Sequence, residues 1–266
     1  MNETMNSIHP KAIVGADVTV GPYTVIAEHV EIGEGTWIGS NVTIMDYVKI
    51  GKHCRIFPGA VVGAIPQDLK YAGEISYVEI GDNVTIRECA TINRGTAASH
   101  KGVTRVGNNC LVMSYVHIAH DCHIGNNVIL TSYVGLAGET DVDDFAIVGG
   151  DSKAHQFTRI GTHVMISGGS MIGKDIPPYV LAGRRPLCYC GINVIGLRRS
   201  GFTSDQIERI HDVYRIIYQV GLNISDACDK VEEILDPSEE RNTILAFIRS
   251  SHRGIIPLKG KRGDDE

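Results

Sequence analysis

A histidine followed directly by an aspartate, His120-Asp121, is the pair in this sequence best suited to acid–base chemistry. An imidazole titrates near neutral pH, and a neighbouring carboxylate can orient the ring and support it as a general base. Three more histidines lie nearby in the sequence or in its repeat, at positions 117, 123 and 155. The sequence therefore predicts a general-base site at His120, whereas a solvated side chain is the simpler interpretation of His123.

The elements that must position this pair follow a six-residue period. Aliphatic residues recur every six positions from Val14 to Val62, from Ile80 to Ile92 and from Val106 to Ile172, and Gly often follows them. Side chains two residues apart on a strand face the same side, so each unit predicts a short strand and a turn. Such hexapeptide repeats resemble those of the left-handed parallel β-helix, a triangular prism with three units per coil. We therefore expect a mainly β fold of this kind.

Stacking places side chains along the prism, because residues 18 apart would lie on neighbouring strands, about 4.8 Å apart. His120 then stacks on Gly138 and next on Gln156, while Asp121 stacks on Glu139. A glycine beside the base leaves a backbone N–H accessible to a developing oxyanion.

A second column holds only small residues, and these are Ser114, Ser132, Gly150 and Gly168. It predicts a shallow channel for an extended chain, although turns that merely prefer small residues would give the same pattern. We expect this column on another side of the chain from His120, so that the two meet only across a subunit boundary.

Two loops and a helical segment interrupt or follow the repeat. We expect loops near 64–77 and 93–105, of which the first keeps the phase of the repeat, with Ile80 one coil from Val62, and the second breaks it. The repeat is predicted to end near 175–178, within a prism domain that spans 1–190. A helical domain with a charged tail is expected to follow at 191–266. Helix starts are expected at Thr203, in a capping box with Gln206, at Ser225 and at Asp236-Pro237.

Composition excludes several classes of protein. The chain has 25 Lys plus Arg against 31 Asp plus Glu, a net charge of -6, so we expect no nucleic-acid partner. No continuous apolar run reaches the length of a membrane span, which predicts a cytoplasmic protein without integral membrane contact. Seven cysteines without a C-x-x-C pair favour reduced thiols over disulfides or a thiolate zinc site.

Six motifs in order carry a resemblance to a known family. They are Q-D-L-K-Y-A-G-E at 67–74, N-R-G-T at 93–96, H-I-A-H-D-C at 117–122, V-D-D-F-A-I at 142–147, H-Q-F at 155–157 and N-x-x-G-L-R-R at 193–199. Together they resemble the acyl-[acyl-carrier-protein]:UDP-N-acetylglucosamine O-acyltransferase family of lipid A biosynthesis. The resemblance implies direct transfer of a 3-hydroxyacyl chain from acyl carrier protein to the glucosamine 3-OH, in a homotrimer and without a metal or other cofactor.

The resemblance also implies roles for individual residues. His120 would be the general base, Asp121 its orienting partner and Gly138 the oxyanion donor. Substrate-binding positions would be Asp68, Lys70, His117, Glu139, His155, Gln156, Asn193 and Arg199. The acyl channel would be lined by Ser132, Gly150 and Gly168, of which Gly168 matches the position that sets acyl length. Four arginines, at 184, 185, 198 and 199, would offer a basic surface to the carrier protein.

Three residues depart from the family's pattern. Glu139 stands where many relatives carry His, Ile195 where they carry Glu, and Pro186 replaces the usual residue near the far end of the channel. Three alternatives stay open: a zinc enzyme similar to γ-type carbonic anhydrases, with His117, His120 and His123 as ligands; an N-acyltransferase acting on a 3-amino sugar; and a scaffold without activity.

Overall fold

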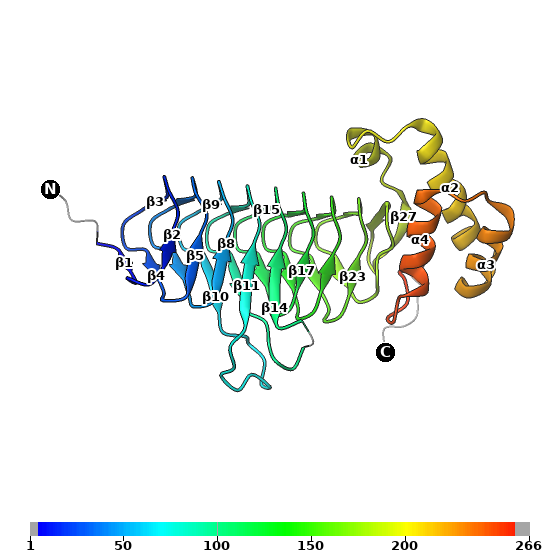
Figure 1. Ribbon diagram of the computed structural model, residues 1–266. Helices are drawn as coiled ribbons and strands as arrows, with labels where there is room; N and C mark the ends of the chain where they lie inside the picture. Colours follow the sequence, from blue (N-terminus) through cyan, green and yellow to red (C-terminus); the bar gives the residue numbers. More distant parts are fainter. Residues whose placement is uncertain (1–4, 100, 259–266) are drawn as a thin grey trace.

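A long prism of short strands with a group of helices at its C-terminal end makes up the computed structural model, which describes residues 5–99 and 101–258 (Figure 1). The charged end of the predicted tail, residues 259–266, lies outside the described residues. Within the described ranges, no helix is long and apolar enough to cross a membrane.

Three sheets form the sides of the prism, and consecutive strands belong to successive sheets. Sheet A contains β1 (Ser7–Ile8), β4 (Val25–Ile26), β7 (Thr43–Ile44), β10 (Val61–Ala64), β13 (Thr91–Asn93), β16 (His117–Ile118), β19 (Gly135–Leu136), β22 (Lys153–Ala154) and β25 (Met171–Ile172). Sheet B contains β2 (Ile13–Val14), β5 (Val30–Ile32), β8 (Val48–Ile50), β11 (Tyr77–Ile80), β14 (Val103–Val106), β17 (His123–Ile124), β20 (Asp141–Val142) and β23 (Arg159–Ile160). Sheet C contains β3 (Thr19–Val20), β6 (Trp37–Ile38), β9 (Arg55–Ile56), β12 (Thr85–Ile86), β15 (Leu111–Val112), β18 (Ile129–Leu130), β21 (Ile147–Val148), β24 (Met165–Ile166), β26 (Val180–Gly183) and β27 (Cys188–Ile192).

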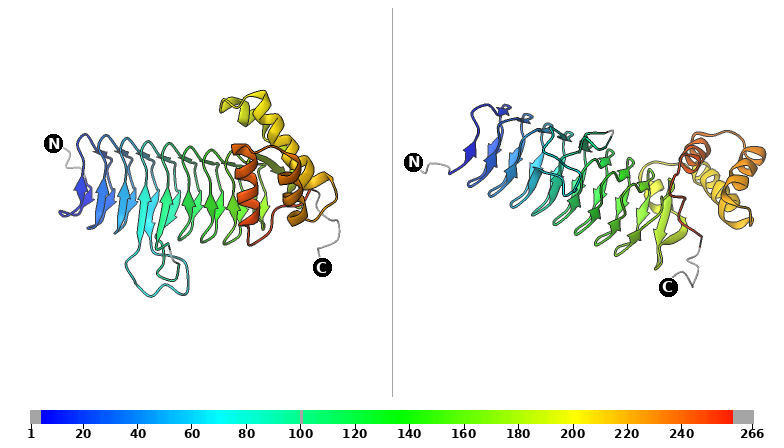
Figure 2. Two further views of the ribbon diagram at one scale, coloured as in Figure 1. Left: turned by 45° about the vertical axis from the view of Figure 1, so that its right-hand side comes forward. Right: turned by 90° about the horizontal axis from the view of Figure 1, so that it is seen from below.

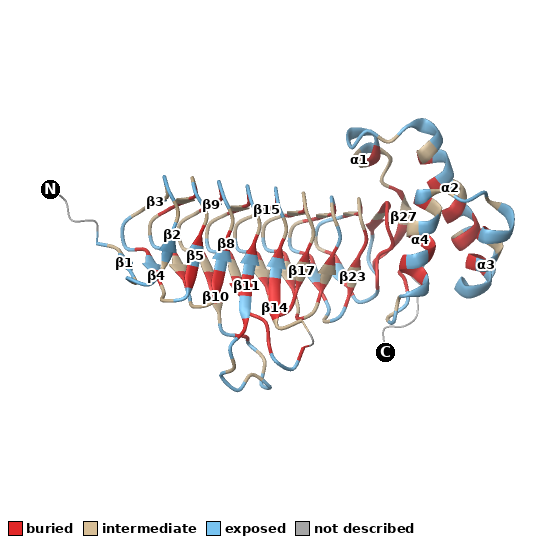
Figure 3. Cartoon of the chain, viewed as in Figure 1, coloured by how far each residue is buried: buried red, intermediate tan, exposed pale blue. Residues whose placement is uncertain are grey.

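The coils wind with a left hand, and strands of one sheet pair in parallel from coil to coil (Figures 1 and 2). The predicted left-handed parallel β-helix with a C-terminal helical region is therefore confirmed. Its core is the column of periodic aliphatics: Ile118 pairs with Leu136, and both are fully buried. Figure 3 shows buried residues recurring in the strands along the prism. Burying such a side chain contributes about 1.5–3 kcal/mol relative to leaving it exposed, and the repeat multiplies that gain along the prism.

The two interruptions leave the prism as loops at its edge between sheets A and B (Figure 2). One spans residues 65–76 between β10 and β11, and the other spans 94–102 between β13 and β14. The expectation that Ile80 lies one coil from Val62 is wrong, because Ile80 pairs with Ile50 and with Val106. Both loops are insertions between adjacent sides of a coil, so period-18 stacking holds before the first loop and after the second, but not across them.

The prism also ends later than the double proline predicted. Sheet C continues through β26, which pairs in parallel with β24, and through β27, which pairs with β26 in the antiparallel sense. Pro177 and Pro178 occupy the approach to β26, where the chain turns before resuming the sheet. The expected boundary at residue 190 consequently falls inside β27.

Four helices follow the strands: α1 (Val194–Arg199), α2 (Ser204–Gln219), α3 (Ile224–Ile234) and α4 (Glu239–Arg249). The capping box of Thr203 with Gln206 is confirmed at the start of α2. The expected cap at Ser225 is wrong, since the Asn223 side chain accepts from Asp226 N–H and begins α3 earlier. Ser238, rather than Asp236-Pro237, caps α4, because its hydroxyl accepts from Arg241 N–H.

A buried tyrosine attaches the helices to the last coil. Tyr214 of α2 is fully buried, and its hydroxyl donates to the carbonyl of Pro178. We predict that Tyr214→Phe destabilises the protein by about 1–3 kcal/mol, because the Pro178 carbonyl loses its buried donor. The midpoint of chemical unfolding followed by circular dichroism measures the change. Tyr133→Phe, at an exposed tyrosine, is the matched control; an equal loss in both variants would contradict the assignment.

Candidate active site

The His–Asp pair lies at the corner between sheets A and B, directly after β16. Asp121 adopts a φ of 59°, a left-handed conformation that Asp tolerates better than most residues, and this sharp corner turns its carboxylate toward His120. His120 Nδ1 lies 2.9 Å from Asp121 Oδ2, and both residues are buried. With Nδ1 engaged by the carboxylate, Nε2 is the ring nitrogen available to a substrate.

The loop at 94–102 supplies the other partners of Asp121. The carboxylate accepts from Thr96 N–H at 3.0 and 3.1 Å and from the Thr96 hydroxyl at 2.8 Å, while Asp121 N–H donates to Thr104 Oγ1. A Cβ on Gly95 would lie 2.6 Å from Asp121 Oδ1, so only glycine permits this approach. Sequence reasoning missed Thr96 and Thr104; the break in phase beside the N-R-G-T motif was the available signal.

The loop at 65–76 brings a second carboxylate to the free face of the imidazole. Asp68 Oδ2 lies 3.6 Å from His120 Nε2, whereas Lys70 on the same loop is exposed. Glu74 joins the two loops, because its carboxylate accepts from Ala97 N–H at 3.0 Å and from Ala72 N–H at 2.8 Å.

Gly138 lies against the His120 ring, as the 18-residue spacing predicted. A Cβ at Gly138 would come within 2.4 Å of His120 Nε2, so any side chain there would displace the ring. Among the residues that the structure describes, no acceptor is bonded to Gly138 N–H, whereas the next N–H, of Glu139, donates to the His120 carbonyl. An unengaged N–H next to a base is suited to receive a developing oxyanion.

Charge and burial act differently on the three neighbouring histidines. The hydrogen bond to Asp121 raises the pKa of His120 above its usual value, although burial opposes the shift; the charges of Asp68 and Glu139 act in the same direction as Asp121. Burial lowers the pKa of His117, and burial together with the Lys101 ammonium lowers that of His123. Of the three, His120 is therefore the strongest base.

The remaining predicted residues are distributed over the chain. His117 faces outward on sheet A with Nδ1 2.7 Å from Thr91 Oγ1, and His155 and Gln156 form the same corner one coil beyond Gly138.

Asn193 caps α1, accepting from Gly196 N–H and donating to the His163 carbonyl. Arg199 is exposed at the end of α1. Figure 1 shows α1 on the side of the prism opposite the edge that carries the loops. Within one chain, α1 is therefore not brought to His120.

The column of small residues lies at the corner between sheets C and A, after β15, β18, β21 and β24. His120 lies at a different corner, between sheets A and B, so the two positions border opposite edges of the outer face of sheet A. Close stacking explains its glycines, since a Cβ on Gly168 would lie 3.1 Å from the Gly150 carbonyl, and one on Gly150 would lie 3.2 Å from that of Ser132.

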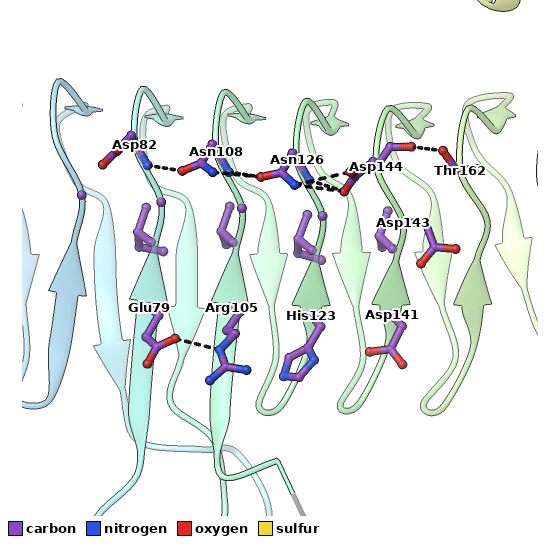
Figure 4. A pocket seen from close by; sticks show the side chains of 18 of the residues that line it. Glu79, Asp82, Arg105, Asn108, His123, Asn126, Asp141, Asp143, Asp144 and Thr162 are labelled. Carbon is purple, nitrogen blue, oxygen red and sulfur yellow. Dashed lines mark hydrogen bonds and ion pairs between the residues drawn. The ribbon is translucent and has the colours of Figure 1, made fainter.

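A polar groove of about 950 Å³ runs along the outer face of sheet B without including His120 (Figure 4). A ladder of side chains borders it, in which the Asn108, Asn126 and Asp144 side chains each accept from the backbone N–H of the preceding coil. His123 lines this groove, whereas His117 lies on sheet A, so the two flank the corner of His120 on different faces. In residues 5–99 and 101–258, no group of three or more His, Cys, Asp or Glu side chains is arranged to hold a metal ion.

Coils of this kind with a buried His–Asp pair define a transferase of the hexapeptide class, and residues 104–138 match the bacterial transferase hexapeptide model. Residues 175–256 match domain 2 of UDP N-acetylglucosamine O-acyltransferase, and residues 3–106 match the GMPPB C-terminal domain. The chain belongs to the acyl-[acyl-carrier-protein]–UDP-N-acetylglucosamine O-acyltransferase family, as the resemblance predicted, and is an acyltransferase.

Several relatives support this assignment over nearly the whole chain. The O-acyltransferase of Thiobacillus denitrificans is 42% identical over 258 residues, which cover 95% of this chain and 100% of the relative. A solved UDP-N-acetylglucosamine acyltransferase from Bacteroides fragilis is 53% identical, with a TM-score of 0.93 and coverage of 96% of this chain and 100% of that one. The corresponding structure from Francisella novicida is 41% identical, with a TM-score of 0.93 and coverage of 96% and 93%.

We predict that Asp121→Asn lowers kcat by between about 10- and 10³-fold, because the amide no longer holds the His120 proton on Nδ1. A base acts only when neutral, so activity falls as pH drops through the His120 pKa. Asp121 is the main cause that raises this pKa. The acid limb of the kcat profile should therefore move to lower pH in the variant. An unchanged limb would show that another group controls it.

Proposed function

We propose that this enzyme transfers a 3-hydroxyacyl chain from acyl carrier protein to the glucosamine 3-OH of UDP-N-acetylglucosamine, the first step of lipid A biosynthesis. The relatives named above carry the corresponding name. The observation that supports the reaction most directly is the buried His120–Asp121 pair beside the unengaged N–H of Gly138. A base and an oxyanion donor within one small space are the two groups that acyl transfer to a hydroxyl requires.

In this mechanism, His120 Nε2 removes the proton of the 3-OH while the sugar oxygen attacks the thioester carbonyl. The oxyanion is stabilised by Gly138 N–H. Its collapse breaks the C–S bond and expels the carrier protein's thiolate, which accepts from His120 the proton taken from the 3-OH. Cys122 is poorly suited to an acyl-enzyme route: it is fully buried, its Sγ donates to the Ala137 carbonyl, and burial raises its pKa to about 12. Direct transfer therefore fits the chain's own nucleophiles best.

The substrate contacts remain proposals. Asp68, Lys70, His117, Glu139, His155 and Gln156 would contact the sugar and the thioester arm around His120. Asn193 and Arg199 would contact the nucleotide, with Arg184, Arg185, Arg198 and Arg199 offering charge to the carrier protein; all four arginines are exposed. The Asn193 side chain already caps α1, so its contact with uridine would have to share that amide.

We propose a homotrimer with sites between subunits. A row of apolar side chains, Leu111, Ile129, Ile147 and Met165, faces outward and half exposed on sheet C of the single chain. Contiguous apolar surface of this kind favours association. A neighbouring subunit would also bring its α1 residues to His120, which one chain alone does not do. The cytoplasmic location stays a prediction.

The deciding experiment is mass spectrometry of products from wild type and His120→Ala incubated with UDP-N-acetylglucosamine and a mixture of 3-hydroxyacyl carrier proteins. We expect a UDP-sugar with one ester-linked acyl chain from wild type, and a rate lower by about 10² to 10⁴ fold in the variant.

The control is His53→Asn, at an exposed histidine on an earlier coil, where Asn tolerates the positive φ. Product formed only with a 3-amino sugar would favour N-acyl transfer. Full activity of His120→Ala would remove His120 as the base.

Acyl length should depend on Gly168. We predict that Gly168→Met shifts the preferred donor toward shorter chains, because the new side chain would project over the channel bordered by Ser132 and Gly150. Competition between donors of different length in one reaction measures the preference. Gly173→Met, at a glycine whose Cβ would meet nothing within 4 Å, serves as control. An unaltered preference in Gly168→Met would place the end of the acyl chain elsewhere.

A further inference from the structure

Two residues of the inserted loop at 94–102 donate hydrogen bonds to Asp121. Thr96 donates to the carboxylate through both its N–H and its hydroxyl, and Lys101 Nζ donates to the Asp121 carbonyl at 3.3 Å. Lys101 also pairs with Asp141 of β20 in sheet B, so the C-terminal end of the loop is anchored to the prism.

The Thr96 hydroxyl and the His120 ring meet at the same carboxylate oxygen. Thr96 Oγ1 lies 2.8 Å from Asp121 Oδ2, and His120 Nδ1 lies 2.9 Å from it. Thr96 is 1% exposed and Asp121 0% exposed, so solvent has almost no access to replace a lost donor. The position of this oxygen therefore decides where the His120 ring lies.

A further contact fixes the direction of the hydroxyl. Thr96 Oγ1 accepts from Ser99 N–H at 3.2 Å, within the same loop turn. Because a lone pair of the oxygen is engaged there, the hydroxyl proton is directed to the carboxylate. The loop thus presents an oriented donor rather than a freely rotating one.

We infer that Thr96 is a positioning residue for the transfer reaction: its hydroxyl holds Oδ2 of Asp121 in place, so that the carboxylate keeps the His120 proton on Nδ1 and leaves Nε2 for the substrate. Glu74 connects this loop to the one that carries Asp68, so both loops are fixed relative to the same corner. The inference rests on the proposed function, because it needs His120 as the base.

The test compares Thr96→Val, which keeps the shape of the side chain but has no hydroxyl, with Thr96→Ser, which keeps the donor. We expect kcat to fall between about 10- and 100-fold in Thr96→Val with KM within about twofold, since a misplaced base slows chemistry without weakening binding. The acid limb of kcat should also move to lower pH, because a loosened carboxylate raises the His120 pKa less. Thr96→Ser should recover most of kcat and the wild-type limb.

Thr24→Val is the matched control. Thr24 is likewise fully buried, and its hydroxyl donates to the Gly39 carbonyl and accepts from Val42 N–H in an early coil. We expect this variant to lose stability, measured by chemical unfolding, while kcat and its pH profile stay as in wild type.

Three results would overturn the inference: wild-type kcat and pH profile in Thr96→Val, no recovery in Thr96→Ser, or an equal fall of kcat in Thr24→Val. The His120→Ala enzyme, assayed in parallel, separates the two proposals. If it is inactive while Thr96→Val behaves as wild type, only the role of Thr96 fails. If it is fully active, the proposed base itself is wrong.

Discussion

Backbone hydrogen bonding between successive coils is the constraint on which the rest of this structure depends. Each short strand bonds to the strand one coil away, as where His117 N–H donates to the Val134 carbonyl and Ala119 N–H to that of Leu136. The pairing holds only where strands of successive coils stay in register, and the interior is filled mainly by aliphatic side chains, with small polar residues such as Thr24 among them. Chemistry is therefore confined to corners, outer faces and insertions.

The proposed active site shows how a buried carboxylate is stabilised in such a rigid fold. A buried carboxylate is stable only when its oxygens are hydrogen-bonded, and a flat coil surface offers too few donors for that. The insertion after β13 supplies them through Thr96, and Thr104 of β14 supplies an acceptor for Asp121 N–H. The prism thus fixes the proposed base and the proposed oxyanion donor, and the loop supplies hydrogen-bond donors to the buried carboxylate beside them.

The sequence predicted the features that follow from the six-residue period. Periodic aliphatics predicted the coils, and the 18-residue spacing predicted that His120 meets Gly138, because no insertion separates them. It did not predict the alignment across the loops, where Ile80 pairs with Ile50, since the length of an insertion does not reveal which sheet receives the chain afterwards.

Local sequence patterns identified neither Thr96 nor the first residue of α3. Thr96 was missed because its partner Asp121 lies 25 positions away, a spacing set by the loop rather than by the repeat. Ser225 and Asn223 are both suitable helix caps, and only the backbone direction entering α3 decides in favour of Asn223.

The antiparallel direction of β27 has a consequence for the molecule's behaviour in solution. A stack of parallel coils ends in a row of unpaired N–H and C=O groups, and such an edge can recruit strands from other molecules. Here the sheet C side of the last coil is closed by β27, which runs the opposite way, and Tyr189 of that strand packs against Tyr214 and Tyr218 of α2. A further coil cannot continue the pattern across a reversed strand covered by helices. The helical end thus limits growth of the solenoid, and protects the protein from end-to-end fibril formation at that end.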